Sequence, residues 1–277
     1  MKPILEFAAI LFVGILNHVI GALFYSKRPE YHKSVTVTER LLGNWVGSIS
    51  AIVVVLLVAI DQPNGFASIG VVTGLNAISN NENAVELGVI FVSIFIIVMM
   101  GIQKIINHLR KRTPEKEVDL SNPAVTGLYQ YQSLLERLAY LTVLPLLVIS
   151  EDLIYRGYLV LLFGNKSHSF LPWVIVSVIL SVIIHLYQGR KVRYIFYQAS
   201  LALLFIGLAI GTGNILAPIA GHLFYDILWT FRVWRAEKSI ETQTVKSSKS
   251  KVFAYLAFVT TNLLLLYFSF LAIVLIG

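Results

Sequence analysis

The chain alternates long apolar runs with short polar segments, and this pattern predicts a helical protein that crosses a membrane many times. About eight runs are apolar over roughly the 20 residues that one helix needs to span a bilayer. Apolar residues are continuous within each run rather than alternating, which excludes a transmembrane β-barrel. The predicted spans are 3–25, 45–60, 84–106, one span within 133–163, 170–189, 194–211, 215–234 and 252–276. We therefore expect an all-α bundle of about eight transmembrane helices.

The composition supports this interpretation and narrows the class of protein. Of the 277 residues, 57% are hydrophobic and only 13% are charged. A soluble domain has about twice that share of charged residues, and it needs them to cover its surface. A cytosolic enzyme, a disordered chain and a fibrous protein are thereby excluded. The absence of cysteine excludes disulfides, thiolate metal sites, iron–sulfur clusters and a cysteine nucleophile.

The positive charges lie in alternate loops, which predicts the orientation of the chain. The formal net charge is +7, from 22 basic and 15 acidic residues. Basic residues of the first, third, fifth and seventh loops are Lys27, Arg28, Lys33 and Arg40; Arg110, Lys111, Arg112 and Lys116; Arg190, Lys191 and Arg193; and Arg232, Arg235, Lys238, Lys246, Lys249 and Lys251. The positive-inside rule makes these loops cytoplasmic and places both termini on the non-cytoplasmic side. The bilayer therefore explains the basic charge, and no nucleic-acid partner is expected.

Polar linkers divide the chain into three parts. Residues 110–123 contain two prolines and many charged side chains, as linkers do. This linker separates an N-terminal three-span region, 1–123, from a predicted catalytic core, 124–235. A cytoplasmic loop and the final span form the third part, 236–277. Between the first linker and the fourth span, we expect residues 129–141 to form an amphipathic helix on the cytoplasmic surface.

The fourth predicted span carries three ionisable residues, Glu151, Asp152 and Arg156. A charge inside a membrane costs roughly 2.5–3.5 kcal/mol on insertion scales, so such residues usually mark a site or an ion pair. Asp152 and Arg156 are four residues apart, on one helical face, and are expected to pair. Glu151 is rotated by about 100° from Asp152 and is expected to lack a cation on its own helix. It is therefore the candidate general base. The alternative is a buried charge cluster that only fixes helix packing.

Histidines lie in two later spans. His185 lies near the end of the fifth span, where an interfacial histidine without function is the alternative. His222 and Asp226 in the seventh span are four residues apart and share a face, so the carboxylate can orient the imidazole. Their alternative is an interhelical hydrogen-bonded pair. Because several spans each supply an acid, a base or an imidazole, the joint pattern favours a shared site.

These residues resemble the motifs of the CPBP family, the CAAX-protease and bacteriocin-processing intramembrane proteases, also called Abi proteins. The family pattern is Glu-Glu-x-x-x-Arg, then Phe-x-x-x-His, then His-x-x-x-Asn/Asp. Here residues 151–157 read Glu-Asp-Leu-Ile-Tyr-Arg-Gly, His185 follows in the next span, and 222–226 read His-Leu-Phe-Tyr-Asp. The resemblance covers about residues 140–235. Asp152 replaces the second glutamate and keeps its charge, whereas Ser181 replaces the aromatic residue of the second motif.

The resemblance implies an intramembrane endopeptidase that hydrolyses a peptide bond with water activated by glutamate. In that mechanism Glu151 is the base, His185 positions the water, and His222 with Asp226 stabilises the oxyanion. Asp152 and Arg156 support them. A zinc ion held by Glu151, His185 and His222 is the alternative to a metal-free site. The implied substrates are peptides or membrane proteins, with or without a lipid anchor. They include prenylated CaaX proteins, pheromones and bacteriocins.

Two other functions and one difficulty of geometry stay open. The chain could be a non-catalytic member of the family, acting in bacteriocin immunity or envelope regulation, or a transporter with a charge relay. A bacterial cell membrane fits the simple loops better than the endoplasmic reticulum. On the predicted boundaries His185 and His222 lie roughly 14 Å apart along the membrane normal, at about 1.5 Å per residue. We therefore expect residues 211–218 to form a broken segment that brings His222 deeper.

Overall fold

The computed structural model describes residues 37–72, 77–109, 131, 133–185 and 192–238. Every regular element within these residues is helical, which confirms the all-α class. The first and eighth predicted spans lie outside the described residues.

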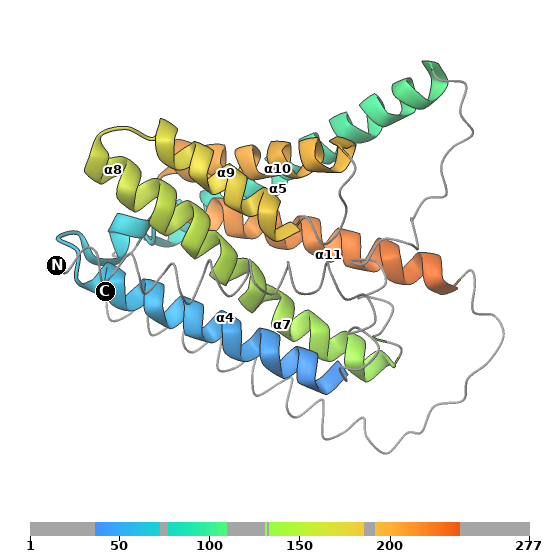
Figure 1. Cartoon of the computed structure of the whole chain (residues 1–277), viewed down its shortest axis with the longest axis horizontal. Coiled ribbons are helices and arrows are strands. Elements are labelled where there is room, and N and C mark those ends of the chain that lie inside the picture. Colours follow the sequence, from blue (N-terminus) through green and yellow to red (C-terminus); the bar gives the residue numbers. More distant parts are fainter. Residues whose placement is uncertain (1–36, 73–76, 110–130, 132, 186–191, 239–277) are drawn as a thin grey trace.

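The helices form an elongated bundle, shown in Figure 1, in which α4 lies beside α7 and α11 runs through the middle. Helix α9 lies along the continuation of α7, and α5 leaves the bundle at one end. The elements are α4 (Val37–Ile60), the short 3₁₀-helix η2 (Gly65–Ile69), α5 (Ala77–Leu109), α7 (Leu134–Asp152), the π-helix η3 (Leu153–Leu162), α8 (Phe163–Ser167), α9 (Leu171–His185), α10 (Val192–Thr212) and α11 (Leu216–Lys238).

Four of the described helices are long and apolar enough to cross a membrane. They are Leu41–Ile60, Ser79–Ile105, Leu134–Ser167 and Tyr194–Thr212. The predicted fifth span is an apolar but shorter helix, Leu171–His185. The predicted seventh span is helical, as α11, but it is not among these four. The total of eight spans and the side on which the termini lie stay predictions.

The fourth span is one continuous helix of 34 residues, Leu134–Ser167. It begins with a capping box, in which the backbone N–H of Glu136 donates to Ser133 Oγ (3.2 Å) and the backbone N–H of Ser133 donates to the Glu136 carboxylate (2.9 Å). The expectation of a separate surface helix over 129–141 is therefore wrong, because residues from Leu134 onward already belong to this helix. Directly after Asp152 the helix widens into the π-helix η3.

Helix α9 packs against η3 and runs in the opposite direction along it (Figure 1). The buried hydroxyl of Ser177 donates to the main-chain carbonyl of Tyr155 at 3.0 Å, which fixes the register between the two helices. One turn after Ser177 comes Ser181, and one turn after that comes His185. The register thus carries His185 toward Glu151, which lies one turn before Tyr155.

A tight turn, Gly213–Ile215, joins α10 to α11. Gly213 ends α10 with a φ of 62°, a left-handed conformation that favours glycine. The turn is buried against the end of η2, where the backbone N–H of Ile215 donates to the carbonyl of Gly70 (2.8 Å). The expected broken segment over 211–218 is therefore shorter than predicted, because its first two and last three residues are helical.

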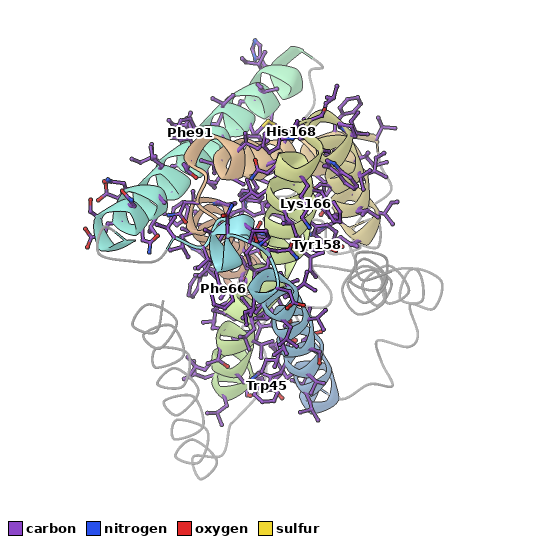
Figure 2. The ribbon with its side chains drawn as sticks, turned by 90° about the vertical axis from the view of Figure 1, so that its left-hand side faces the viewer. Trp45, Phe66, Phe91, Tyr158, Lys166 and His168 are labelled. Atoms are coloured by element: carbon purple, nitrogen blue, oxygen red, sulfur yellow. The ribbon has the colours of Figure 1, made fainter. Side chains whose placement is uncertain are left out.

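Three apolar clusters hold the helices together. The first joins α4, η2, η3 and the end of α9, the second joins α4, α7 and the end of α11, and the third joins α5, α10 and α11. Helices α5 and α11 approach so closely that a Cβ atom on Gly88 would collide with the carbonyl oxygen of Ala217. The outer face of α5 carries exposed apolar side chains, such as that of Phe91. Figure 2 labels this residue in a view turned by 90° from Figure 1.

Candidate active site

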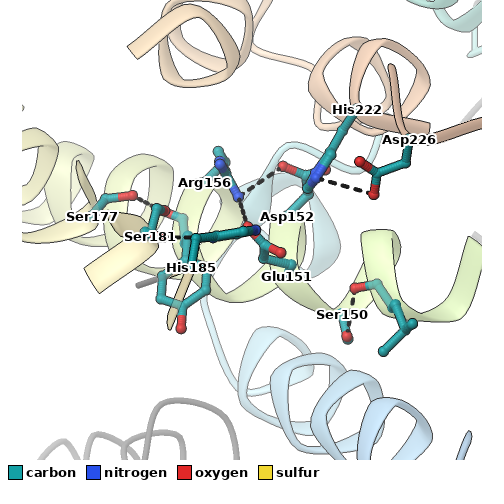
Figure 3. Close-up of polar contacts among 11 residues, drawn as sticks. Ser150, Glu151, Asp152, Arg156, Ser177, Ser181, His185, His222 and Asp226 are labelled. Atoms are coloured by element: carbon teal, nitrogen blue, oxygen red, sulfur yellow. Dashed lines mark hydrogen bonds and ion pairs between the residues drawn. The ribbon is translucent and has the colours of Figure 1, made fainter. Parts of the chain in front are cut away.

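Three ionisable side chains are buried at the centre of the bundle. Asp152, Arg156 and His222 are 0%, 2% and 5% exposed, and they come from α7, η3 and α11. Buried charges are stable only when they are paired. The structure therefore brings together residues that are 70 positions apart in the sequence, as Figure 3 shows.

The guanidinium of Arg156 contacts both acidic residues of the first motif. Its Nη1 lies 3.2 Å from Asp152 Oδ1 and 3.2 Å from Glu151 Oε1. The predicted pairing of Asp152 with Arg156 is confirmed, but the expectation that Glu151 lacks a cation on its own helix is wrong. A π-helix hydrogen-bonds residue i to residue i+5 and therefore brings those positions close together. The change to π-helix at Leu153 explains how Arg156 reaches Glu151, five residues earlier.

His222 joins α11 to α7. Its Nδ1 lies 3.1 Å from Asp152 Oδ2, and its Nε2 lies 3.7 Å from Asp226 Oδ2. The predicted contact between His222 and Asp226 is confirmed, and the contact with Asp152 is an additional one. Glu151 lies within electrostatic range of both His222 and His185, so both histidines are near the same carboxylate.

His185 is the last residue of α9 and is partly buried. Its Nδ1 lies 2.7 Å from the main-chain carbonyl of Ser181, one turn earlier. Such a contact requires a proton on Nδ1, so Nε2 of a neutral ring is left to accept a proton or a hydrogen bond. Residues 186–189 of the predicted span lie outside the described residues. Figure 3 shows His185 beside Glu151 of the cluster.

The cluster has a fully buried part and a partly exposed part. Asp152 and Arg156 are almost fully buried, whereas the side chains of Glu151 and Asp226 are 14% and 30% exposed. A base that activates water needs fixed geometry. Arg156 supplies it for Glu151, because it holds one of the carboxylate oxygens.

Sequence reasoning missed Phe205 on α10. Its ring is 1% exposed and stacks on the imidazole of His222, with centroids 4.7 Å apart and planes at 26°. The guanidinium carbon of Arg156 lies 5.4 Å from the same ring. A phenylalanine within an apolar span carries no signal of its own, so only the fold could reveal this contact.

The described side chains do not fit the zinc alternative. Among the residues that the structure describes, no three histidine or carboxylate groups are arranged to hold a metal ion. Both nitrogens of His222 face carboxylates, and the carboxylate of Glu151 is paired with a guanidinium. Neither arrangement leaves a set of ligands converging on one point, so we derive no catalytic step through zinc.

Fold and cluster together define a class: a helical membrane protein with acidic, basic and imidazole side chains gathered inside the bundle. In a comparison with known families, residues 133–228, about a third of the chain, match the model described as type II CAAX prenyl endopeptidase Rce1-like. The resemblance to the CPBP family is thereby confirmed over this segment, which lies within the predicted core 124–235. No curated protein and no solved structure matches the chain.

Proposed function

We propose that the chain is an intramembrane endopeptidase in which Glu151 activates the water that attacks a peptide bond. The observation that carries this proposal is the environment of Glu151. Its side chain is 14% exposed, held by Arg156 at 3.2 Å and within electrostatic range of two imidazoles. The match to an endopeptidase family over the same residues supports it.

In the proposed reaction Glu151 takes a proton from water while the water oxygen bonds to the substrate carbonyl carbon. His185, through Nε2, orients that water. When the carbon–nitrogen bond breaks, the proton on Glu151 passes to the leaving amine. The second proton of the water then moves from the new carboxylic acid to the amine, so the products are a carboxylate and an ammonium group. No other reactant is needed, so atoms and charges balance.

The oxyanion of the tetrahedral intermediate requires a hydrogen-bond donor, and His222 is suited to supply it. Asp152 binds Nδ1 at 3.1 Å, whereas the carboxylate of Asp226 stays 3.7 Å from Nε2. That separation is too long for a good hydrogen bond. When the ring is a doubly protonated imidazolium, Nδ1–H donates to Asp152 and Nε2–H is available to donate to the oxyanion. Asp226 as a carboxylate has no proton to donate, and its part is to orient the imidazole. Arg156 and Asp152 hold Glu151 and His222 in place.

The substrate class we propose is a prenylated peptide or membrane protein. A prenylated cysteine near a C-terminus is a lipid anchor that delivers a peptide to the bilayer. A site buried among membrane-spanning helices is reached most readily by a substrate that is itself held in the membrane. This proposal follows the name of the matched family.

Cleavage by purified protein in lipid vesicles tests the function. The probe is a fluorogenic peptide with a farnesylated cysteine followed by three residues, and the same peptide without the farnesyl group is its control. We expect the wild type to cleave the farnesylated peptide and Glu151→Ala to bind it without cleaving it. The metal content of the same samples is measured alongside.

Two results would contradict the proposal. Binding of the peptide by both proteins without cleavage would favour the non-catalytic family member. Saturable flux of a solute across the vesicle membrane, without cleavage, would favour the transporter.

A further inference from the structure

Helix α10 brings an aromatic ring, that of Phe205, into contact with the ionisable cluster. Phe205 is 1% exposed and belongs to the apolar cluster that joins α5, α10 and α11. Its ring contacts two members of the cluster rather than only apolar neighbours. Those two members, His222 and Arg156, come from different helices.

The contact with His222 fixes the plane of the imidazole. The two rings lie 4.7 Å apart and only 26° from parallel. The hydrogen bond to Asp152 holds one nitrogen, but a single hydrogen bond still permits the ring to tilt about that nitrogen. A flat ring stacked on one face removes this freedom, so the other nitrogen keeps a constant direction.

Phe205 also contacts the guanidinium of Arg156. The central carbon of the guanidinium lies 5.4 Å from the Phe205 ring and 5.9 Å from the Tyr155 ring. Distances below about 6 Å to an aromatic face are those of cation–π interactions. Arg156 therefore contacts an aromatic residue of its own helix and one of α10, while its Nη1 contacts the two carboxylates.

Ser181 on α9 bears on the role of the Phe205 ring. The second motif places a serine where the family pattern has an aromatic residue, and this serine is buried on α9. No ring can reach the cluster from that position of α9. Phe205 supplies an aromatic surface from the neighbouring helix α10, 24 positions later in the sequence.

We propose that Phe205 is a positioning residue that holds the imidazole of His222 and the guanidinium of Arg156 in their working orientations. This inference rests on the proposed peptidase function. It assigns no chemistry to Phe205 itself, which acts through the two groups that it contacts.

The test uses full-length protein in lipid vesicles and the farnesylated fluorogenic peptide. Phe205→Leu removes the ring but keeps an apolar side chain, and Phe205→Tyr keeps the ring. Leu201→Ala, one turn earlier on α10 and equally buried, is the matched control for lost packing. We measure kcat, KM and the thermal unfolding midpoint of each variant.

We expect Phe205→Leu to lower kcat about tenfold, which corresponds to about 1.4 kcal/mol of transition-state stabilisation. Its KM should stay within twofold of the wild type, because orientation of the catalytic groups changes while substrate contacts do not. Phe205→Tyr should keep at least a third of the wild-type kcat. Leu201→Ala should lower the unfolding midpoint without a comparable loss of kcat.

Two outcomes would overturn the inference. One is a Phe205→Leu variant that keeps its kcat within twofold of the wild type. The other is an equal loss of kcat in Leu201→Ala, which would show that the ring contributes packing alone. Either result leaves the peptidase function intact as long as the wild type cleaves the peptide and Glu151→Ala does not.

Discussion

Two long helical runs of similar length serve different purposes in this bundle. In the run Leu134–Ser167, 56% of the most apolar stretch is buried inside the protein. In the run Ser79–Ile105 of α5, only 11% of the corresponding stretch is buried. Both are long and apolar enough to cross a membrane. Only the first changes to a π-helix, at Leu153, and only the first carries charged residues deep inside the bundle.

The difference shows that length and apolarity predict where a helix lies but not what it does. Lipid can surround α5 on most sides, so its sequence is constrained mainly where it meets α11. The run Leu134–Ser167 is surrounded by protein, and each charge on it needs a partner. Substitutions on the two runs can separate the constraint of helix packing from the constraint of charge pairing.

Arg156→Met should have the largest effect. It leaves the buried carboxylate of Asp152 and the partly buried carboxylate of Glu151 without the guanidinium, and removing one partner of a buried ion pair typically costs about 3–5 kcal/mol of stability. We also expect at least a hundredfold loss of peptide cleavage. Thermal unfolding of the purified protein and kcat are measured together.

Lys104→Met on α5 is the matched control, because it removes an exposed cation from the other run. We expect it to change stability by less than about 0.5 kcal/mol. Equal effects of the two substitutions would contradict the distinction between the runs.

Asp226→Ala should lower kcat about 10–100-fold, because His222 loses the carboxylate that faces its Nε2 at 3.7 Å. Asp226→Asn keeps the shape and a polar contact, so it should lower kcat only a few-fold. The cleavage assay on the two variants shows whether Asp226 acts by orienting the imidazole of His222 or by its negative charge. A complete loss in Asp226→Asn would show that the charge itself is required.

Gly88→Ala on α5 should lower the free energy of unfolding by about 1–3 kcal/mol, because the added methyl collides with the backbone of α11. Gly101→Ala, on the same helix but with open space around it, should be neutral or stabilising by up to about 1 kcal/mol. Thermal unfolding of the two variants measures the difference. If both behave alike, the close packing of α5 on α11 is wrong.

Ile97→Ala on the outer face of α5 should have the smallest effect, within about 0.5 kcal/mol, because the side chain is 69% exposed. Val92→Ala, on the same helix but fully buried, should cost about 1 kcal/mol or more. The unfolding midpoints of the two variants measure this contrast. A larger effect at Ile97 would indicate that this face of α5 contacts protein rather than lipid.

Local spacing predicted two of the contacts and missed those that depend on helix type or on tertiary structure. His222 and Asp226 are four apart within the α-helix α11, as predicted. The predicted contact of Asp152 with Arg156 also forms, although Arg156 lies in the π-helix η3. The pairing of Glu151 with Arg156 did not follow, because apolar sequence gives no warning of a π-helix. The contact of Asp152 with His222 joins helices that are far apart in the sequence, and spacing along the chain does not reveal it.

Boundaries of elements were predicted less well than their existence. The predicted surface helix over 129–141 failed because residues after Leu134 are apolar enough to continue into the span. The predicted broken segment over 211–218 narrowed to three residues because a single glycine in a left-handed conformation is sufficient to end α10. In both cases regular helix extends further along the chain than the predicted boundary.

Turnover and binding measured together on Glu151→Gln test the central claim most directly. This variant keeps the size of the side chain and removes its ability to take a proton from water. We expect it to bind the farnesylated peptide in lipid vesicles with a Kd within threefold of the wild type while kcat falls at least a thousandfold. Cleavage that persists in Glu151→Gln, or the loss of binding and stability along with turnover, would contradict the role of Glu151 as the base.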